Sequence, residues 1–228
     1  FIEEEGLHMQ NKKSLLLMLA MAFFAVLVLV GCSDDSTTEE VDKKDSDTST
    51  ETAAETEYPM TIKHALGEAV LESKPERIVT IQWANHDISL ALGVVPVGFS
   101  AANFGVQDDS GLLPWTKEKL DELGATDPNV FQDTDGLDFE AISDANPDVI
   151  LAAYSGITEE EYETLTQIAP VVAYPTSAWT TTWREQVELN AAGMGMKEEG
   201  EQLIKDTENL IAEKLSAYPQ IEGKKVVW

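Results

Sequence analysis

Cys32 is the only cysteine of this 228-residue chain, and with three histidines it forms a small set of side chains suited to nucleophilic or metal chemistry. A lone cysteine cannot form an intrachain disulfide. A protein-bound transition metal usually needs several His or carboxylate ligands. The sequence also lacks Gly-x-Ser-x-Gly, His-Glu-x-x-His and phosphate-binding glycine motifs. We therefore expect neither an enzyme nor a metal site, and no cofactor.

The residues around Cys32 suggest a different use for its thiol. Residues 15–30 are sixteen consecutive apolar residues, with two lysines before them and Gly31 after them. This layout is typical of an export signal, and the apolar run is shorter than the roughly 20 residues that span a bilayer. The sequence Leu-Val-Gly-Cys at 29–32 resembles a bacterial lipobox, in which a peptidase cuts before the cysteine after its thiol has been acylated.

The lipobox resemblance implies that residues 1–32 are a signal peptide that ends at the lipidated Cys32. Residues 1–8 would lie upstream of the true start, which we expect at Met9. The lipid would anchor the protein to the cell membrane, facing the outside of the cytoplasmic membrane. An uncleaved signal anchor with an incidental cysteine is the alternative.

Acidic residues dominate the rest of the chain. Residues 33–57 carry ten acidic residues against two lysines and almost no large apolar side chains, which predicts a disordered acidic linker. Residues 58–228 hold 29 acidic residues against 11 Lys and Arg, which leaves a net charge of −18. Because phosphate contacts need clustered basic residues, nucleic acid is excluded as a partner.

Beyond the linker, short apolar segments alternate with segments that read as capped helices. Asp138 can cap one helix, and Thr158 with Glu161 and Thr182 with Glu185 form two capping boxes. We expect strands at 77–81, 94–99, 149–153, 171–174 and 223–228. We expect helices at 84–92, 117–123, 138–146, 158–168, from 182 onward and at 197–215. The alternation predicts an α/β fold with a mainly parallel sheet flanked by helices.

Aromatic residues follow the expected strands. In parallel sheets ligands collect outside the carboxyl ends of the strands. The segments at those ends contain four aromatic side chains, namely Trp83, Phe104, Tyr154 and Trp179. For any one ring, packing under a neighbouring loop is an equal alternative. Together the four rings favour a binding site.

Residues 62–228 resemble the substrate-binding lipoproteins of iron-siderophore and cobalamin ABC importers. The resemblance rests on the order of five segments: PERIVTI, LALGVVPVGFS, DFEAISDANPDVILAAYSG, QIAPVVAYP and TWREQVELNAAGMG. Such proteins have two α/β lobes joined by one long helix, with the ligand held between the lobes. The resemblance implies an N-terminal ligand-binding lobe at 58–193, a connecting helix at 194–218 and the start of a truncated second lobe at 219–228.

The resemblance also implies functional residues. Glu140 matches the first-lobe glutamate that docks to arginines on the transporter, although an acid near a helix N-terminus also complements the helix dipole. The positions that fall on the family's cleft-facing loops are Trp83, Asn85, Phe104, Tyr154, Ser155 and Trp179. These loops contain no Lys or Arg, which favours a neutral or cationic iron complex such as a ferric hydroxamate, recognised by aromatic faces.

The expected protein is therefore a monomeric, membrane-anchored receptor that captures a ferric siderophore and delivers it to an ABC permease dimer with its ATPase. Cobalamin or haem as the ligand, and a surface adhesion or scaffold lipoprotein, remain alternatives. The segment Asp-Thr-Asp-Gly-Leu-Asp at 133–138 has its glycine fourth, whereas an EF-hand needs it sixth, so we expect a turn and a helix cap there.

Overall fold

A computed structural model of the chain describes residues 57–106, 108–133 and 135–225. The expected signal peptide, the lipidated Cys32 and nearly all of the expected linker lie outside the described residues, as does the end of the strand expected at 223–228. No helix among the residues described is long and apolar enough to cross a membrane.

A parallel sheet organises the described part of the chain. Its five strands lie in the order β5-β4-β3-β6-β7, and every neighbouring pair is parallel. The strands are β3 (Ile78–Thr80), β4 (Gly98–Ser100), β5 (Val130–Phe131), β6 (Val149–Leu151) and β7 (Val171–Val172). The sequence-based prediction of a mainly parallel sheet flanked by helices is confirmed.

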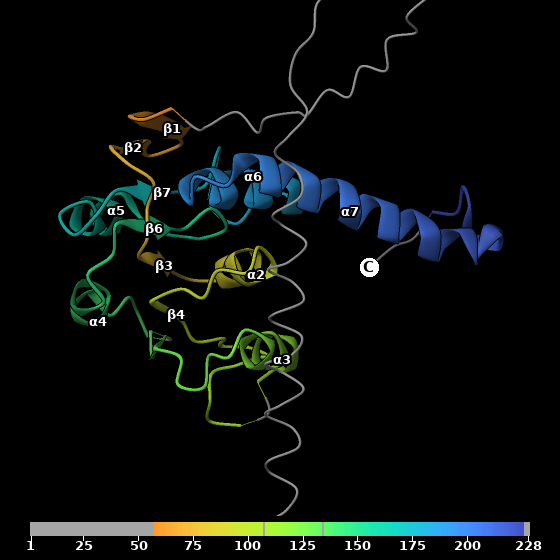
Figure 1. Cartoon of the computed structure of the whole chain (residues 1–228), viewed down its shortest axis with the longest axis horizontal. Helices are drawn as coiled ribbons and strands as arrows, with labels where there is room; N and C mark the ends of the chain where they lie inside the picture. Colours follow the sequence, from red (N-terminus) through yellow and green to blue (C-terminus); the bar gives the residue numbers. More distant parts are fainter. Residues whose placement is uncertain (1–56, 107, 134, 226–228) are drawn as a thin grey trace, which may run out of the picture. The chain divides into compact units, whose positions relative to one another are not determined.

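Helices cover both faces of this sheet. In Figure 1, α4 and α5 lie on one side of the strands, and α2, α3 and α6 lie on the other. The α-helices are α2 (Asn85–Ala91), α3 (Pro114–Glu122), α4 (Phe139–Asp144), α5 (Glu159–Leu165), α6 (Trp183–Gly193) and α7 (Lys197–Ser216), and a 3₁₀ turn, η1, follows at Pro219–Ile221. Because both faces are covered, every residue of β3, β4, β6 and β7 is buried, without the alternation of a half-exposed strand.

Local capping signals fix where three helices begin. The Asp138 side chain accepts a hydrogen bond from the Ala141 N–H at the start of α4. Capping boxes at Thr158 and Thr182 start α5 and α6, as the sequence predicted. The helix expected at 117–123 begins earlier, at Pro114, because proline is favoured in the first turn of a helix.

One strand prediction needs correction, and three strands were not predicted. The segment expected as a strand at 94–99 joins the sheet only at Gly98, since the Val94 N–H bonds to the Ser89 carbonyl at the end of α2 and Pro96 has no N–H to donate. The prediction also missed a hairpin of β1 (Met60–His64) and β2 (Gly67–Leu71), which lies beside β7. It missed β5 as well.

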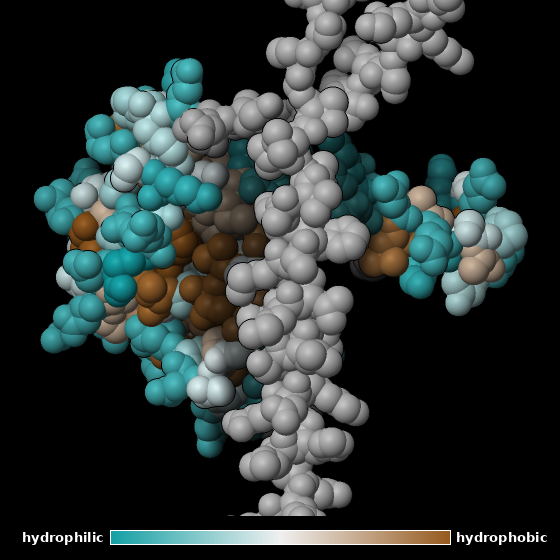
Figure 2. Space-filling view, viewed as in Figure 1, coloured by the Kyte–Doolittle hydropathy of each residue, from teal (hydrophilic) through white to brown (hydrophobic). Residues whose placement is uncertain are grey.

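The long helix α7 packs on α6 through its first turns. A side chain at Gly200 would overlap the Ala191 side chain, so the glycine permits this close approach. Further along, Leu210, Ile211 and Leu215 are about half exposed. Figure 2 shows brown, hydrophobic side chains among teal ones on this part of α7. The observed bounds confirm the helix expected at 197–215.

Candidate ligand-binding site

The order of the strands creates a crevice between β3 and β6. The chain leaves β3 toward β4 and β5 on one side of the sheet, whereas β6 leads to β7 on the other side. The loops that follow two neighbouring strands therefore diverge at their carboxyl ends, which is where open α/β sheets bind ligands. These two loops are residues 81–84 and 152–158.

A pocket of about 540 Å³ lies at the carboxyl ends of these strands. That volume is within the usual range for small-molecule sites. The lining residues are Gln82, Trp83, Ser100, Ala101, Asn103, Phe104, Asp133, Gly136, Tyr154 and Trp179. The four aromatic residues expected at the site therefore line one pocket, although they come from four separate loops. Their contact with a ligand stays a prediction.

Strained backbone holds Trp83 at the pocket. Its neighbours Gln82 and Ala84 both have left-handed backbones, with φ angles of 59° and 57°. Such conformations cost about 1–2 kcal/mol per non-glycine residue, so other contacts must hold them. Gln82 supplies two of these: its N–H donates to the Ser100 hydroxyl at 2.6 Å, and its Oε1 accepts from the Gly156 N–H at 2.7 Å. Gln82 thus ties its own loop to the end of β4 and to the loop that follows β6.

Trp179 is the second strained residue of the pocket, with a φ of 60°. Its N–H donates to the Ser155 carbonyl at 3.0 Å, and its ring meets Tyr154 edge-on, with ring centroids 5.3 Å apart and planes at 80°. A side chain at Gly156 would overlap the Trp179 indole. The glycine therefore allows the tryptophan ring to lie over this loop, next to the pocket.

Asn85 and Ser155 lie behind the pocket and do not line it. Both are fully buried and bond to the protein itself. The Ser155 hydroxyl donates to the Ala152 carbonyl at 2.7 Å. Both side chains were expected to contact the ligand, and neither is among the residues that line the pocket. Ligand contact by either one stays a prediction. Both residues support loops that carry the aromatic rings.

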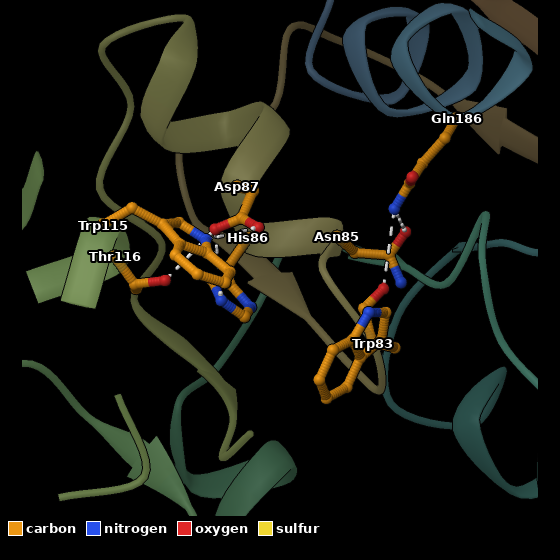
Figure 3. Close-up of polar contacts among 7 residues, drawn as sticks. All are labelled: Trp83, Asn85, His86, Asp87, Trp115, Thr116 and Gln186. Carbon is orange, nitrogen blue, oxygen red and sulfur yellow. Dashed lines mark hydrogen bonds and ion pairs between the residues drawn. The ribbon is translucent and has the colours of Figure 1, made fainter. Parts of the chain in front are cut away.

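The Asn85 side chain links three elements. Its Nδ2 donates to the carbonyls of Ile81 and Tyr154, and its Oδ1 accepts from the Tyr154 N–H and from the side chains of Gln186 and Asn190 on α6. Figure 3 shows Asn85 facing Gln186, which also reaches the Trp83 carbonyl. Every polar atom of the amide is therefore satisfied, as burial requires.

Asp133 is a pocket residue that the sequence-based prediction missed as a site residue. The Ser100 hydroxyl donates a hydrogen bond to its carboxylate. Burial raises the pKa of Asp133 above its usual value, the nearby Asp138 charge adds to this, and the hydrogen bond from Ser100 opposes it. None of the ten lining residues is Lys, Arg, His or Glu, and Asp133 is the only carboxylic acid among them.

A separate polar cluster lies between α2 and α3, and Figure 3 shows it beside the Asn85 network. Asp87 accepts hydrogen bonds from the Trp115 indole at 3.3 Å and from Thr116 at 3.2 Å, and it lies 3.5 Å from His86. His86 is buried against Phe99, and burial lowers its pKa. No group of three or more metal-ligating side chains occurs among the residues described. His86 is thus a packed residue of the first turn of α2.

Glu140 lies in the first turn of α4 and is exposed. Asp138 caps the same helix, so the helix cap expected there is confirmed. An exposed carboxylate at this place can pair with a basic partner or complement the helix dipole. The transporter-docking role of Glu140 stays a prediction.

Comparison with known proteins identifies relatives of the chain. Residues 78–228 match the sequence model of the family described as periplasmic binding protein. YfiY of Bacillus subtilis, described as a probable siderophore-binding lipoprotein, is 27% identical over 205 residues, which are 86% of this chain and 54% of YfiY.

Two solved structures resemble the fold. PiaA of Streptococcus pneumoniae in complex with ferrichrome is 54% identical, with a TM-score of 0.69 over 72% of this chain and 54% of PiaA. A periplasmic solute binding protein of Mycobacterium smegmatis is 28% identical, with a TM-score of 0.64 over 72% of this chain and 56% of that protein. The chain therefore spans about half the length of the relatives it matches.

Proposed function

The chain belongs to the periplasmic binding protein family, and from this premise we propose that it captures a ferric siderophore for an ABC importer. In this proposal the described residues supply the first ligand-binding lobe and the joining helix of a receptor. Cys32 carries the lipid that anchors the receptor to the outside of the cytoplasmic membrane. The receptor delivers its ligand to a permease dimer, and the ATPase of the transporter supplies the energy.

One observation carries the proposal, namely the aromatic pocket of about 540 Å³ at the carboxyl ends of the strands. The pocket is lined by Trp83, Phe104, Tyr154 and Trp179; Phe104 is largely exposed and Trp179 is about half exposed. Exposure of aromatic side chains to water is unfavourable. Burial of these rings against an apolar or cationic ligand is favourable, so the rings favour ligand binding. The likeness to PiaA, solved with ferrichrome, supports a ferric hydroxamate as the ligand.

Docking to the permease is the second part of the proposal. Glu140 is exposed on α4, outside the pocket, so a partner can reach it while the pocket holds a ligand. An arginine on the permease would form a charge-assisted hydrogen bond with its carboxylate. The acidic balance of residues 58–228, −18, would also steer a basic docking surface toward the lobe.

The experiment is a tryptophan-fluorescence titration of the complete gene product in mild detergent, with ferric hydroxamates, ferric catecholates, haem and cobalamin. Trp83 and Trp179 line the pocket, so bound ligand should quench their emission. Submicromolar quenching by a ferric hydroxamate supports the proposal. Quenching by haem or cobalamin alone would mean that this compound, and not a ferric siderophore, is the ligand. No response to any of them, from a folded protein, favours a surface adhesion or scaffold lipoprotein instead.

A further inference from the structure

We propose that Asp133, oriented by Ser100, is a specificity-determining ligand contact that favours ferric complexes with an N–H donor or a positive charge and rejects anionic ones. This inference rests on the function proposed above and deepens it, because it assigns the selection of ligand charge to one residue of the pocket.

The position of Asp133 makes it a contact residue. It lies just after β5, at the edge of the sheet, and lines the pocket together with the aromatic rings. The side chain is neither fully exposed nor fully buried, so its carboxylate can meet a ligand without a change of fold. A carboxylate is an acceptor only, and it matches an amide N–H or an ammonium group on a ligand.

Ser100 fixes the direction of this carboxylate. Its hydroxyl donates a hydrogen bond to the Asp133 carboxylate and accepts one from the Gln82 N–H. Gln82 is the residue before Trp83. The acid is thus tied to the same framework that positions an aromatic ring. A side chain held in this way loses little conformational entropy when the ligand binds.

The surroundings of Asp133 explain why its charge would act on the ligand. Among the residues that line the pocket no basic side chain offsets it. In the described part of the chain, no ion pair to Asp133 is found either. The field of an unpaired carboxylate in a partly desolvated site attracts cations and repels anions, so it discriminates between ligands of similar size.

A purely structural role explains these features less well. An asparagine could accept the same hydrogen bond from Ser100 without the cost of partly burying a charge. Partial desolvation makes the ionised form of a carboxylate in an aromatic pocket unfavourable, unless a positive charge or a further hydrogen-bond donor lies beside it. The described residues that line the pocket offer no positive charge. In this proposal the ligand supplies the charge or the donor.

The test measures affinities of the complete gene product for three ferric complexes: a neutral trihydroxamate, a trihydroxamate with a free ammonium group, and an anionic tricatecholate. In Asp133→Asn we expect the affinity for the cationic complex to fall about tenfold, which is the size of one charge contact across a partly solvated pocket. The neutral complex should lose less than about threefold, and the anionic complex should bind more tightly than to wild type.

Asp135→Asn is the matched control, because Asp135 is exposed, lies two residues away, carries the same charge and does not line the pocket. It should leave all three affinities unchanged. If Asp133→Asn is poorly folded, Asp133→Ser provides the same change of charge. Equal changes for all three complexes, or none, overturn the role of Asp133 while ferric-complex binding by the wild type stands. Failure of the wild type to bind any of them overturns both proposals.

Discussion

Asn85 exchanges two hydrogen bonds with the backbone of Tyr154. Its Nδ2 donates to the Tyr154 carbonyl at 3.0 Å, and its Oδ1 accepts from the Tyr154 N–H at 3.1 Å. Asn85 begins α2 and Tyr154 follows β6, so the pair joins the two loops that diverge between β3 and β6. Beyond the ends of β3 and β6 the backbones no longer pair with each other, and the Asn85 side chain takes the place of that pairing for the N–H and carbonyl of Tyr154.

Substitution Asn85→Ala should therefore destabilise the fold. It leaves the N–H and carbonyl of Tyr154 without partners, and each such buried group costs about 1–3 kcal/mol. We expect a loss of about 3 kcal/mol in the free energy of unfolding, measured by urea denaturation. Asn103→Ala is the control, because Asn103 is exposed and should change stability by less than about 0.5 kcal/mol. A loss below about 1 kcal/mol for Asn85→Ala would contradict the proposed support.

Substitution Gly156→Ala should displace the Trp179 ring. The backbone of Gly156 is not left-handed, so alanine fits the chain conformation, and the added methyl group meets the indole. We expect a cost of about 1–3 kcal/mol, a shifted tryptophan emission and weaker ligand binding.

A double-mutant cycle isolates this contact. In a Trp179→Ala background the methyl group at position 156 has no indole to overlap, so the cost of Gly156→Ala should nearly vanish. Coupling of at least about 1 kcal/mol between the two changes, from urea denaturation of all four proteins, supports the packing. Additive effects would show that the glycine serves another purpose.

Features that depend on neighbouring residues in the sequence were predictable. The capping boxes at Thr158 and Thr182 involve side chains three residues apart, so the pattern is visible in the sequence and both helices begin as expected. The alternation of buried strands and helices likewise predicted the parallel sheet, because parallel neighbours need crossovers.

Features that depend on contacts between distant residues could not be predicted from the sequence. The burial of Asn85 depends on Gln186 and Asn190, about a hundred positions away, so the sequence showed only a polar residue in an expected binding loop. Asp133 becomes a pocket residue because β5, with two residues, pairs with β4, and so short a strand has no recognisable period. The pocket residues Gln82, Ser100 and Asn103 carried no signal beyond their position after a strand.

The pH dependence of stability should reveal the ionised state of Asp133. Burial raises its pKa in the folded chain above the unfolded value, so the folded state binds the proton more tightly. Its carboxylate thus opposes folding at neutral pH, and this penalty is relieved as the pH falls through the raised pKa. We expect Asp133→Asn to be more stable than wild type at pH 7, with the difference shrinking toward pH 4 in urea denaturation. A wild type that is the more stable protein at pH 7 would mean that the hydrogen bond from Ser100 outweighs burial.

Substitution Glu140→Ala in the complete gene product should separate docking from ligand binding. Glu140 is exposed and lies outside the pocket, so the affinity for the ferric complex should not change, whereas uptake of the labelled complex into cells should fall about tenfold. Glu160→Ala is the matched control, because Glu160 is an exposed acid in the first turn of α5. Both changes remove a favourable interaction with a helix dipole and should cost about 0.5 kcal/mol of stability. Unchanged uptake with Glu140→Ala, together with that small loss, would assign Glu140 to the helix dipole alone, because a docking residue must alter transport.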